Sequence, residues 1–274
     1  MQVLSKSWLM LAWSFIVALL PLQALSEPQQ IGPQQIGIVI MHGKGGSPAK
    51  HVSDLASALE AKGYLVANLE MPWSGKRAYD VPVSAAEEQV VAALTALRSK
   101  GANSVFVAGH SQGGIFTLHF AGKHAIDGGI CMAPGGSVDS RVYREKLGDS
   151  VARAQQLVAE GKGSEKTSLN DYEGQKGTYP LQTTPAAYLT WFDTEGAMNA
   201  HRAARALNPQ TPMLWIVPKH ERPNLRKISI PLFDALPKHA HTVLAEPNAD
   251  HLGAPSASLD EIVRWIAEVV SAKR

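Results

Sequence analysis

The sequence has very little cysteine, since Cys131 is the only one among its 274 residues. Without a second thiol the chain cannot close an internal disulfide, even in an oxidising compartment. Cys131 lies in the apolar stretch 129–133, so we expect it to be buried and unreactive. The hydrophobic content of 45% is enough for one sizeable core, which agrees with a single α/β domain.

An excess of charge of one sign is also absent, because 26 basic and 24 acidic residues give a net charge of +2. No basic stripe with interleaved aromatic residues occurs, and we therefore predict no nucleic-acid partner. The ten histidines include no His-Glu-x-x-His motif. His119 and His124 are five residues apart and do not share a helix face. We predict neither a metal ion nor a cofactor.

Long apolar runs are confined to the N-terminus. Lys6 precedes an apolar run at residues 8–20, which is too short to span a bilayer comfortably. Ala24 and Ser26 are small residues at positions −3 and −1 of a signal-peptidase site. The pattern predicts a signal peptide over 1–26, cleaved after Ser26, and a periplasmic or secreted protein with no stable membrane anchor. The alternative is an uncleaved signal anchor that holds the protein at the membrane.

The motif Gly-His-Ser-Gln-Gly at residues 109–113 is the most informative feature that is present. The apolar stretch 104–108 before it predicts a buried strand, and a helical pattern follows over 112–124. A Gly-x-Ser-x-Gly motif between strand and helix predicts a nucleophile elbow, with the hydroxyl of Ser111 at the strand end. The helix N-terminus then points at the same site.

A glycine-rich turn, His-Gly-Lys-Gly-Gly at residues 42–46, follows an earlier apolar strand. Such a turn lets a backbone N–H point at a developing alkoxide without obstruction by a side chain. We predict the N–H groups of Lys44 and Gln112 as an oxyanion hole. The alternatives are a plain flexible turn or a phosphate-binding loop, although neither phosphate-loop spacing is present.

An acid and a histidine follow the serine in the chain order Ser, Asp/Glu, His. Glu221 lies in the loop after the apolar strand 213–217, and His251 lies in the loop after strand 242–245. Because the carboxyl ends of parallel strands share one edge of a sheet, we expect Ser111, Glu221 and His251 to meet there.

Strands and helices alternate along the chain in the βαβ manner. The predicted strands are 36–41, 64–71, 104–108, 128–133, 213–217 and 242–245. The predicted helices are 49–62, 85–100, 112–124, 140–160, a segment around 230–236, and 259–271. Ser84 and Glu87 have the spacing of a capping box at the start of helix 85–100. The pattern predicts a mostly parallel, doubly wound sheet of about six strands.

These motifs resemble the α/β-hydrolase superfamily, specifically its small esterase and lipase-like serine hydrolases. The resemblance covers residues 36–270 and rests on 42–46, 109–113, 218–221 and 250–251. It implies an α/β-hydrolase fold over residues 27–274.

The resemblance also implies a helical cap insertion after the strand that the family counts as its sixth. A connection at about 135–210, longer than the usual few residues, fits this position, where relatives carry a cap that shapes the acyl pocket. Tyr188 and Trp191 are the predicted substrate-binding residues of the cap, unless they pack its own small core. Trp73 is a further one, because its loop leaves the catalytic edge.

The acid loop departs from the family pattern, which usually has aspartate, often as Gly-x-x-Asp. Here the acid is Glu221, which is chemically competent. Asp139, at a position that some relatives use, and Asp193 are the alternative acids. Asp250 is adjacent to His251 in sequence, and we do not expect its side chain to reach Nδ1.

Together these residues predict a serine hydrolase that cleaves a small-molecule carboxylic ester through an acyl-enzyme intermediate. In this interpretation Ser111 attacks, His251 is the base, and Glu221 is the acid of the triad. The alternatives are an amidase, thioesterase or lactonase with the same triad, or a catalytically silent binding protein with this fold. No oligomeric state is predicted.

Overall fold

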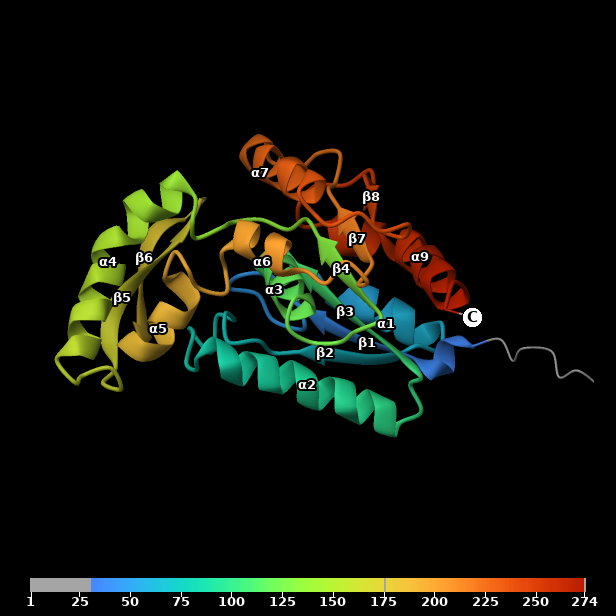
Figure 1. Ribbon diagram of the computed structural model, residues 1–274, viewed down its shortest axis with the longest axis horizontal. Coiled ribbons are helices and arrows are strands. Elements are labelled where there is room, and N and C mark those ends of the chain that lie inside the picture. The colour runs from blue at the N-terminus through green and yellow to red at the C-terminus, as the bar shows by residue number, and fades with distance from the viewer. Residues whose placement is uncertain (1–30, 175, 274) are drawn as a thin grey trace, which may run out of the picture. The chain divides into compact units, whose positions relative to one another are not determined.

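The computed structural model describes residues 31–174 and 176–273, so the predicted signal peptide lies outside the described residues. Within them, six strands form one parallel sheet in the order β2-β1-β3-β4-β7-β8 (Figure 1). These strands are β1 (Ile36–Met41), β2 (Leu65–Leu69), β3 (Ser104–His110), β4 (Gly128–Met132), β7 (Met213–Ile216) and β8 (Val243–Ala245). The predicted mostly parallel sheet of about six strands is confirmed.

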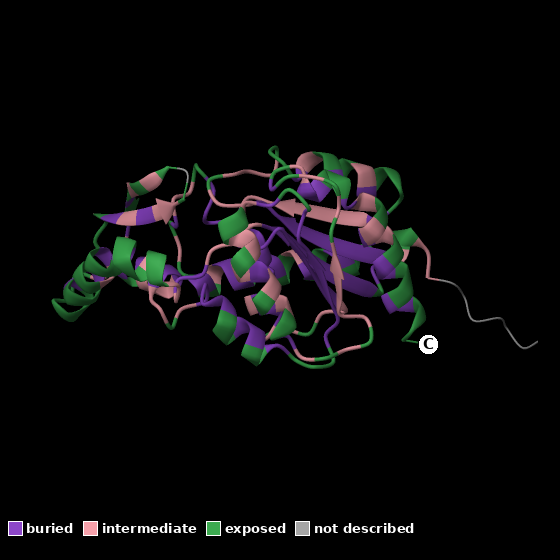
Figure 2. Cartoon of the chain, turned by 90° about the horizontal axis from the view of Figure 1, so that it is seen from above, coloured by how far each residue is buried: buried purple, intermediate pink, exposed green. Residues whose placement is uncertain are grey.

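Helices cover both faces of the sheet, because successive residues of each strand point to opposite sides. Ile38 and Ile40 of β1 pack with helices α1 (Ser53–Ala61) and α9 (Leu259–Ser271). Val39 and Met41 point the other way, toward α2 (Val83–Ser99), α3 (Gln112–Ala121) and α6 (Ala200–Ala206). Figure 2 shows the central strands buried and the outer surfaces of the helices exposed.

Three helix starts differ from the sequence prediction. α1 begins at Ser53, four residues after the predicted start. α2 begins at Val83 with Pro82 as its N-cap residue, so Ser84 and Glu87 form no capping box. The carboxylate of Glu87 instead contacts His119 of α3 and Lys123 in the turn after it. α7 (Pro223–Asp234) begins well before residue 230, because proline is favoured in the first turn of a helix. No described helix is both long and apolar enough to cross a bilayer.

The insertion after β4 contains α4 (Arg141–Ala159), β5 (Thr167–Glu173), β6 (Gly177–Thr183) and α5 (Pro185–Phe192). We call this segment, residues 141–192, the cap. In Figure 1 it lies at the end of the sheet where the parallel strands finish. The antiparallel hairpin β5-β6 was not predicted. Its buried face includes the charged Asp171, and Pro180 lies inside β6. The hairpin therefore lacks the alternation of apolar residues that indicates a strand.

Candidate active site

Ser111 lies at a sharp turn between β3 and α3. Its backbone has φ 53° and ψ −114°, a conformation that residues other than glycine rarely adopt. A Cβ on Gly109 would lie 2.0 Å from the carbonyl oxygen of Gly113, and a Cβ on Gly113 would lie 2.8 Å from the carbonyl oxygen of His42. The two motif glycines are therefore required because backbone segments touch at both positions.

Ser111, His251 and Glu221 form one hydrogen-bonded chain. Nε2 of His251 is 3.1 Å from Oγ of Ser111, and its Nδ1 is 2.7 Å from Oε2 of Glu221. The side chains of His251 and Glu221 are only 8% and 2% exposed. With Nδ1–H donating to the carboxylate, Nε2 is left as the acceptor for the serine hydroxyl. This is the arrangement that a nucleophile, a base and an orienting acid require.

Backbone pairing beyond the ends of β7 and β8 brings the acid and the histidine together. The N–H of Lys219 donates to the carbonyl of Pro247 at 2.9 Å, and that of His220 donates to Ala249 at 3.0 Å. His220 and Asp250 form a further parallel bridge. The two loops thus continue the parallel pairing of the sheet for several residues. Glu221 and His251 are the residues that directly follow the last paired positions, His220 and Asp250.

The alternative acids lie elsewhere. Asp139 contacts His201 of α6 at 2.9 Å. Asp193 accepts a hydrogen bond from the N–H of Glu195, and Asp250 accepts one from the N–H of Gly253. Neither these carboxylates nor any other described one except the predicted glutamate is hydrogen-bonded to His251.

His110 supports the histidine loop from within. Its Nε2–H donates to the carbonyl oxygen of His251 at 2.8 Å. Burial, together with repulsion by the neighbouring His251, lowers the pKa of His110 to about 3. The His110 ring is therefore neutral near pH 7, and it holds the backbone of His251 in place without adding a positive charge beside His251.

The glycine-rich turn at 42–46 lies directly beside Ser111, since a Cβ on Gly43 would be 3.2 Å from Cβ of Ser111. The N–H of Lys44 has no hydrogen-bond acceptor within the described ranges. Gln112 is the first residue of α3, and first-turn N–H groups have no partner within their helix. Both predicted oxyanion donors are therefore free to bind a ligand.

The side chain of Lys44 leaves the turn and reaches into the cap. Its Nζ donates to Oδ1 of Asp171 at 2.6 Å and to the carbonyl of Tyr172 at 3.1 Å. Burial alone would lower the pKa of Lys44, but Asp171 and Tyr143 together outweigh it and raise this pKa above its ordinary value. Tyr79 donates to Oε1 of Gln112 at 3.0 Å and lies 3.4 Å from Oδ2 of Asp171. No motif or periodicity in the sequence indicates these contacts.

A cavity of about 480 Å³ opens over Ser111. It is bounded by the glycine-rich turn, by His251, by Val142 and Tyr143 of the cap, and by the first turns of α7. The hydrogen-bonded chain of serine, histidine and glutamate therefore has one end at a space large enough for a small molecule.

Residues 38–265 match the family described as "Alpha/beta hydrolase family". The protein belongs to the α/β hydrolase family. A search among curated proteins finds no match.

Solved structures agree with the fold of this α/β hydrolase. One, from a study of the metagenome-derived lipolytic enzymes LipS and LipT, is 20% identical with a TM-score of 0.56, and the match covers 88% of this chain and 95% of that one. The monoacylglycerol lipase of Paleococcus ferrophilus is 20% identical with a TM-score of 0.59 and coverage of 87% and 96%. Est1E from Butyrivibrio proteoclasticus with bound ferulic acid is 15% identical with a TM-score of 0.59 and coverage of 87% and 91%.

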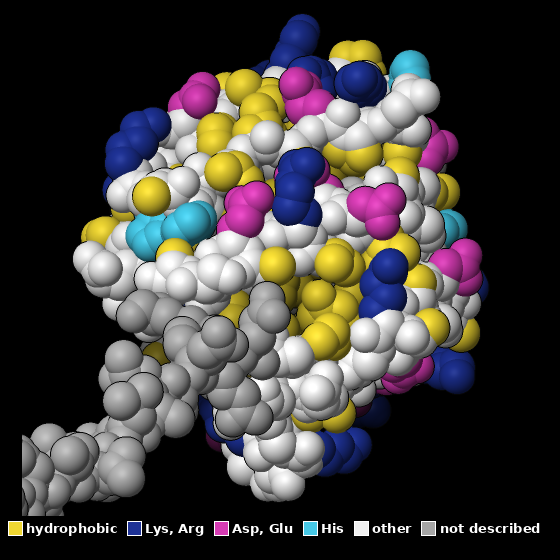
Figure 3. Space-filling view, turned by 90° about the vertical axis from the view of Figure 1, so that its right-hand side faces the viewer, with side chains coloured by type: hydrophobic (Ala, Val, Ile, Leu, Met, Phe, Trp, Pro, Cys, Tyr) yellow, Lys and Arg dark blue, Asp and Glu magenta, His cyan; other side chains and the backbone are white. Residues whose placement is uncertain are grey.

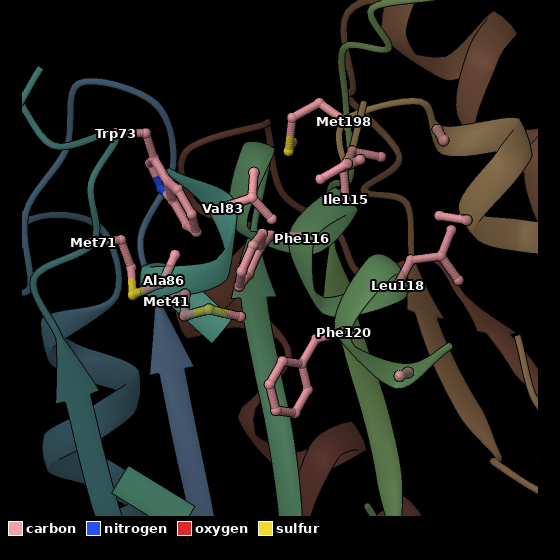
Figure 4. Packing of buried hydrophobic residues seen from close by; sticks show 14 of the residues in the cluster. Met41, Met71, Trp73, Val83, Ala86, Ile115, Phe116, Leu118, Phe120 and Met198 are labelled. Atoms are coloured by element: carbon pink, nitrogen blue, oxygen red, sulfur yellow. The ribbon is translucent and has the colours of Figure 1, made fainter. Parts of the chain in front are cut away.

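The three aromatic residues predicted to bind substrate do not line the cavity of this α/β hydrolase, so that prediction is corrected. Trp73 is 1% exposed and packs 5.1 Å from the ring of Phe116 (Figure 4). Tyr188 and Trp191 are fully buried, and Trp191 borders only a much smaller void. Trp191 packs between cap and sheet, against Trp73 and Phe116. Tyr188 packs within the cap, where it stacks on Phe192 and donates to the carbonyl of Asn170.

Cys131, the single thiol of this α/β hydrolase, is fully buried. Burial raises the pKa of the Cys131 thiol, whose Sγ donates to the carbonyl of Gly114 at 3.2 Å. This agrees with the expectation of a buried, unreactive cysteine. Over residues 31–174 and 176–273, no group of three or more His, Cys, Asp or Glu side chains is arranged to hold a metal ion.

Proposed function

We propose that this α/β hydrolase cleaves a carboxylic ester by acyl transfer to water, with Ser111 as nucleophile. The observation that carries the proposal is the hydrogen-bonded chain from Ser111 through His251 to Glu221, which begins at the floor of a cavity. The solved neighbours include lipolytic enzymes, a monoacylglycerol lipase and a carboxyl esterase, and also one proline iminopeptidase. The greater number of esterases and lipases favours an ester over an amide.

In the first half of the reaction, Nε2 of His251 takes the hydroxyl proton of Ser111 as Oγ attacks the ester carbonyl carbon. The carbonyl oxygen becomes an alkoxide, which the N–H groups of Lys44 and Gln112 stabilise. Glu221 holds the imidazole in the required tautomer and stabilises the imidazolium. The imidazolium then protonates the leaving alcohol, and the ester of Ser111 remains.

In the second half, His251 takes a proton from water, and the hydroxide adds to the acyl carbon. The second alkoxide occupies the same pair of N–H donors. Its collapse expels Oγ of Ser111, which recovers its proton from His251, and the carboxylic acid leaves. No group beyond the chain's own residues and water enters this mechanism.

The test is labelling with a fluorophosphonate probe and turnover of 4-nitrophenyl esters of increasing acyl length. Wild-type protein should be labelled at Ser111 and hydrolyse the short esters. Ser111→Ala should remain folded, resist labelling and lose kcat by about 10⁴-fold or more. A folded Ser111→Ala protein that keeps substantial esterase activity contradicts the proposal, and an unlabelled, inactive wild type supports a silent binding protein.

We also propose that the mature protein is periplasmic or secreted and begins at Glu27, from the apolar run and the small residues before it. Intact mass measurement on protein exported by a Gram-negative host tests this directly. A chain beginning at Glu27 supports cleavage, whereas an intact chain in the membrane fraction supports the signal-anchor alternative.

A further inference from the structure

The charged side chains around the cavity over Ser111 are almost all basic. Among the described residues, Glu173 is the only acidic one that lines the cavity. Its basic lining residues are Lys44, Lys50, Arg141, Lys176 and Arg222. This imbalance is local, because the whole chain is close to neutral. On the face shown in Figure 3, basic and acidic side chains are interspersed.

Several of these cations are neutralised by a carboxylate, but two are not. Lys44 has its buried aspartate, and Lys176 pairs with the one acidic lining residue at 2.8 Å. Arg141 pairs at 2.6 Å with an exposed glutamate one helical turn along α4. Lys50 and Arg222 form no ion pair with any residue in the described part of the chain. The cavity lining therefore holds two cations that are not paired with a carboxylate, and the carboxylate of Glu221 is buried behind His251.

The basic residues come from separate elements that surround the nucleophile. Lys50 follows the glycine-rich turn, and Arg222 follows Glu221 directly at the start of α7. Lys176 lies at the tip of the cap hairpin, with its Nζ 3.6 Å from where a Cβ on Gly45 would be. A negative group on a bound molecule would thus meet a cation within a short distance of the reacting carbonyl.

Apolar side chains form the rest of the wall. Leu225 and Ile228 of α7, Val142 of α4 and Leu252 beside the histidine all line the cavity. A ligand that fits both parts has an apolar segment and an anionic group. A wholly neutral ester would leave Lys50 and Arg222 without a counter-charge.

We propose that the substrate of this enzyme is an ester that carries a negatively charged group, such as a carboxylate, near the scissile bond. This inference rests on the proposed esterase function and adds the substrate class. Unbalanced cations lining a concave site raise the local concentration of anions and accelerate their association. Lys50 is exposed and Arg222 is half-buried, so each contributes about two- to fivefold and the two together favour the anionic ester by about tenfold.

Matched pairs of esters test the proposal on each side of the scissile bond. On the acyl side, mono-4-nitrophenyl adipate is compared with 4-nitrophenyl hexanoate, and on the alcohol side 4-acetoxybenzoate is compared with 4-acetoxybenzamide. Each kcat/KM is divided by the rate of uncatalysed hydrolysis of the same ester. We expect the anionic member of at least one pair to be preferred by about tenfold, mainly through KM. The preference for the anionic ester should decrease in roughly 0.5 M salt, because salt screens exposed charges.

Variants connect the preference to the named cations. Lys50→Gln and Arg222→Gln should each lower the ratio of anionic to neutral kcat/KM by about two- to fivefold. Lys62→Gln is the matched control, since Lys62 is exposed at the end of α1 and does not line the cavity. The control should leave the ratio unchanged.

Failure of the anionic-substrate proposal can be distinguished from failure of the proposed esterase function. Equal or greater preference for the neutral member of both pairs, with turnover that still depends on Ser111, overturns the anionic substrate and leaves the esterase intact. Calorimetric binding of 4-acetoxybenzoate and 4-acetoxybenzamide to Ser111→Ala protein gives a reading that needs no turnover. The acyl-side pair is measured in the same way. Tighter binding of the anion in at least one pair, weakened by Lys50→Gln, supports the inference, and equal binding within both pairs contradicts it.

Discussion

Nζ of Lys44 and Oδ1 of Asp171 lie 2.6 Å apart and join the glycine-rich turn to the cap hairpin. The two side chains are 11% and 0% exposed, so the pair is shielded from solvent. Tyr79 extends the contact to Gln112. Both residues whose N–H groups are the proposed oxyanion donors are thereby connected to a single carboxylate of the cap.

Removal of either member of this pair should be more damaging than removal of both. Lys44→Met or Asp171→Asn alone leaves a buried charge or its partner uncompensated, which costs about 3–5 kcal/mol in comparable buried pairs. The double variant leaves no unpaired charge and should be more stable than either single variant. Chemical denaturation of the four proteins measures this coupling.

Catalysis should not recover with stability in the double variant. If the pair positions the turn, kcat of the double variant stays well below the wild-type value although its free energy of unfolding is restored. Wild-type kcat in a stable double variant would mean that the pair has a structural role only. Lys162→Gln, which breaks an exposed pair with Glu160, is the control and should change neither stability nor kcat measurably.

The acid of the triad can be assigned by a series of amide variants. Glu221→Gln keeps the shape of the side chain but removes the charge that stabilises the imidazolium. The equivalent change in a serine protease costs about 10⁴-fold in kcat. We expect a comparable loss here with KM little changed, and partial activity in Glu221→Asp. Asp139→Asn and Asp193→Asn should have near wild-type kcat, and a crippled Asp139→Asn enzyme with an active Glu221→Gln enzyme would reverse the assignment.

Much of the sheet could be predicted from the sequence because its strands are short, apolar and bounded by turns. β1 spans Ile36–Met41, as the run of apolar residues predicts. The cap hairpin could not be predicted in this way, since Asp171 occupies a buried position whose cost is met by Lys44, 127 residues away along the chain. A local pattern carries no information about such a partner.

The candidate site likewise has residues that the sequence predicts and residues that it does not. Ser111 is marked by a local motif, and Glu221 and His251 follow from chain order and the shared edge of a parallel sheet. Trp73 lies in a loop, where no periodicity fixes the direction of a side chain, and its ring packs on Phe116 instead of lining the cavity. The basic residues around the cavity come from segments far apart in sequence, so only the folded chain shows them together.

Gly109, two residues before Ser111, should tolerate no side chain. A Cβ on Gly109 would lie 2.0 Å from the carbonyl oxygen of Gly113, so Gly109→Ala must displace the elbow. We expect loss of soluble protein or of labelling at Ser111. Gly148→Ala is the matched control, because Gly148 lies inside α4 with no atom within 4 Å of the added methyl. It should keep full activity and gain about 0.5–1 kcal/mol in stability; an active Gly109→Ala protein would contradict the close contact.

Glu87 should make the protein less stable in acid. Burial opposes ionisation of Glu87, but hydrogen bonds from His119 and Lys123 outweigh it and lower its pKa from 4.5 to about 2. A carboxyl whose pKa is depressed by folding stabilises the folded state above pH 4.5, and this contribution is lost as pH falls toward 2.

Glu87→Gln should therefore cost about 2 kcal/mol near pH 6, a value reduced from the full shift because Lys123 is half exposed. The difference between wild type and variant should narrow below pH 4.5, by at most about 1.4 kcal/mol per pH unit. Chemical denaturation from pH 6 downward measures it, and subtraction removes the separate acid sensitivity of His110. Glu88→Gln, at an exposed neighbouring position, should follow the wild-type profile. A wild-type-to-Glu87→Gln difference that is independent of pH would show that the carboxylate charge does not stabilise the contact between α2 and α3.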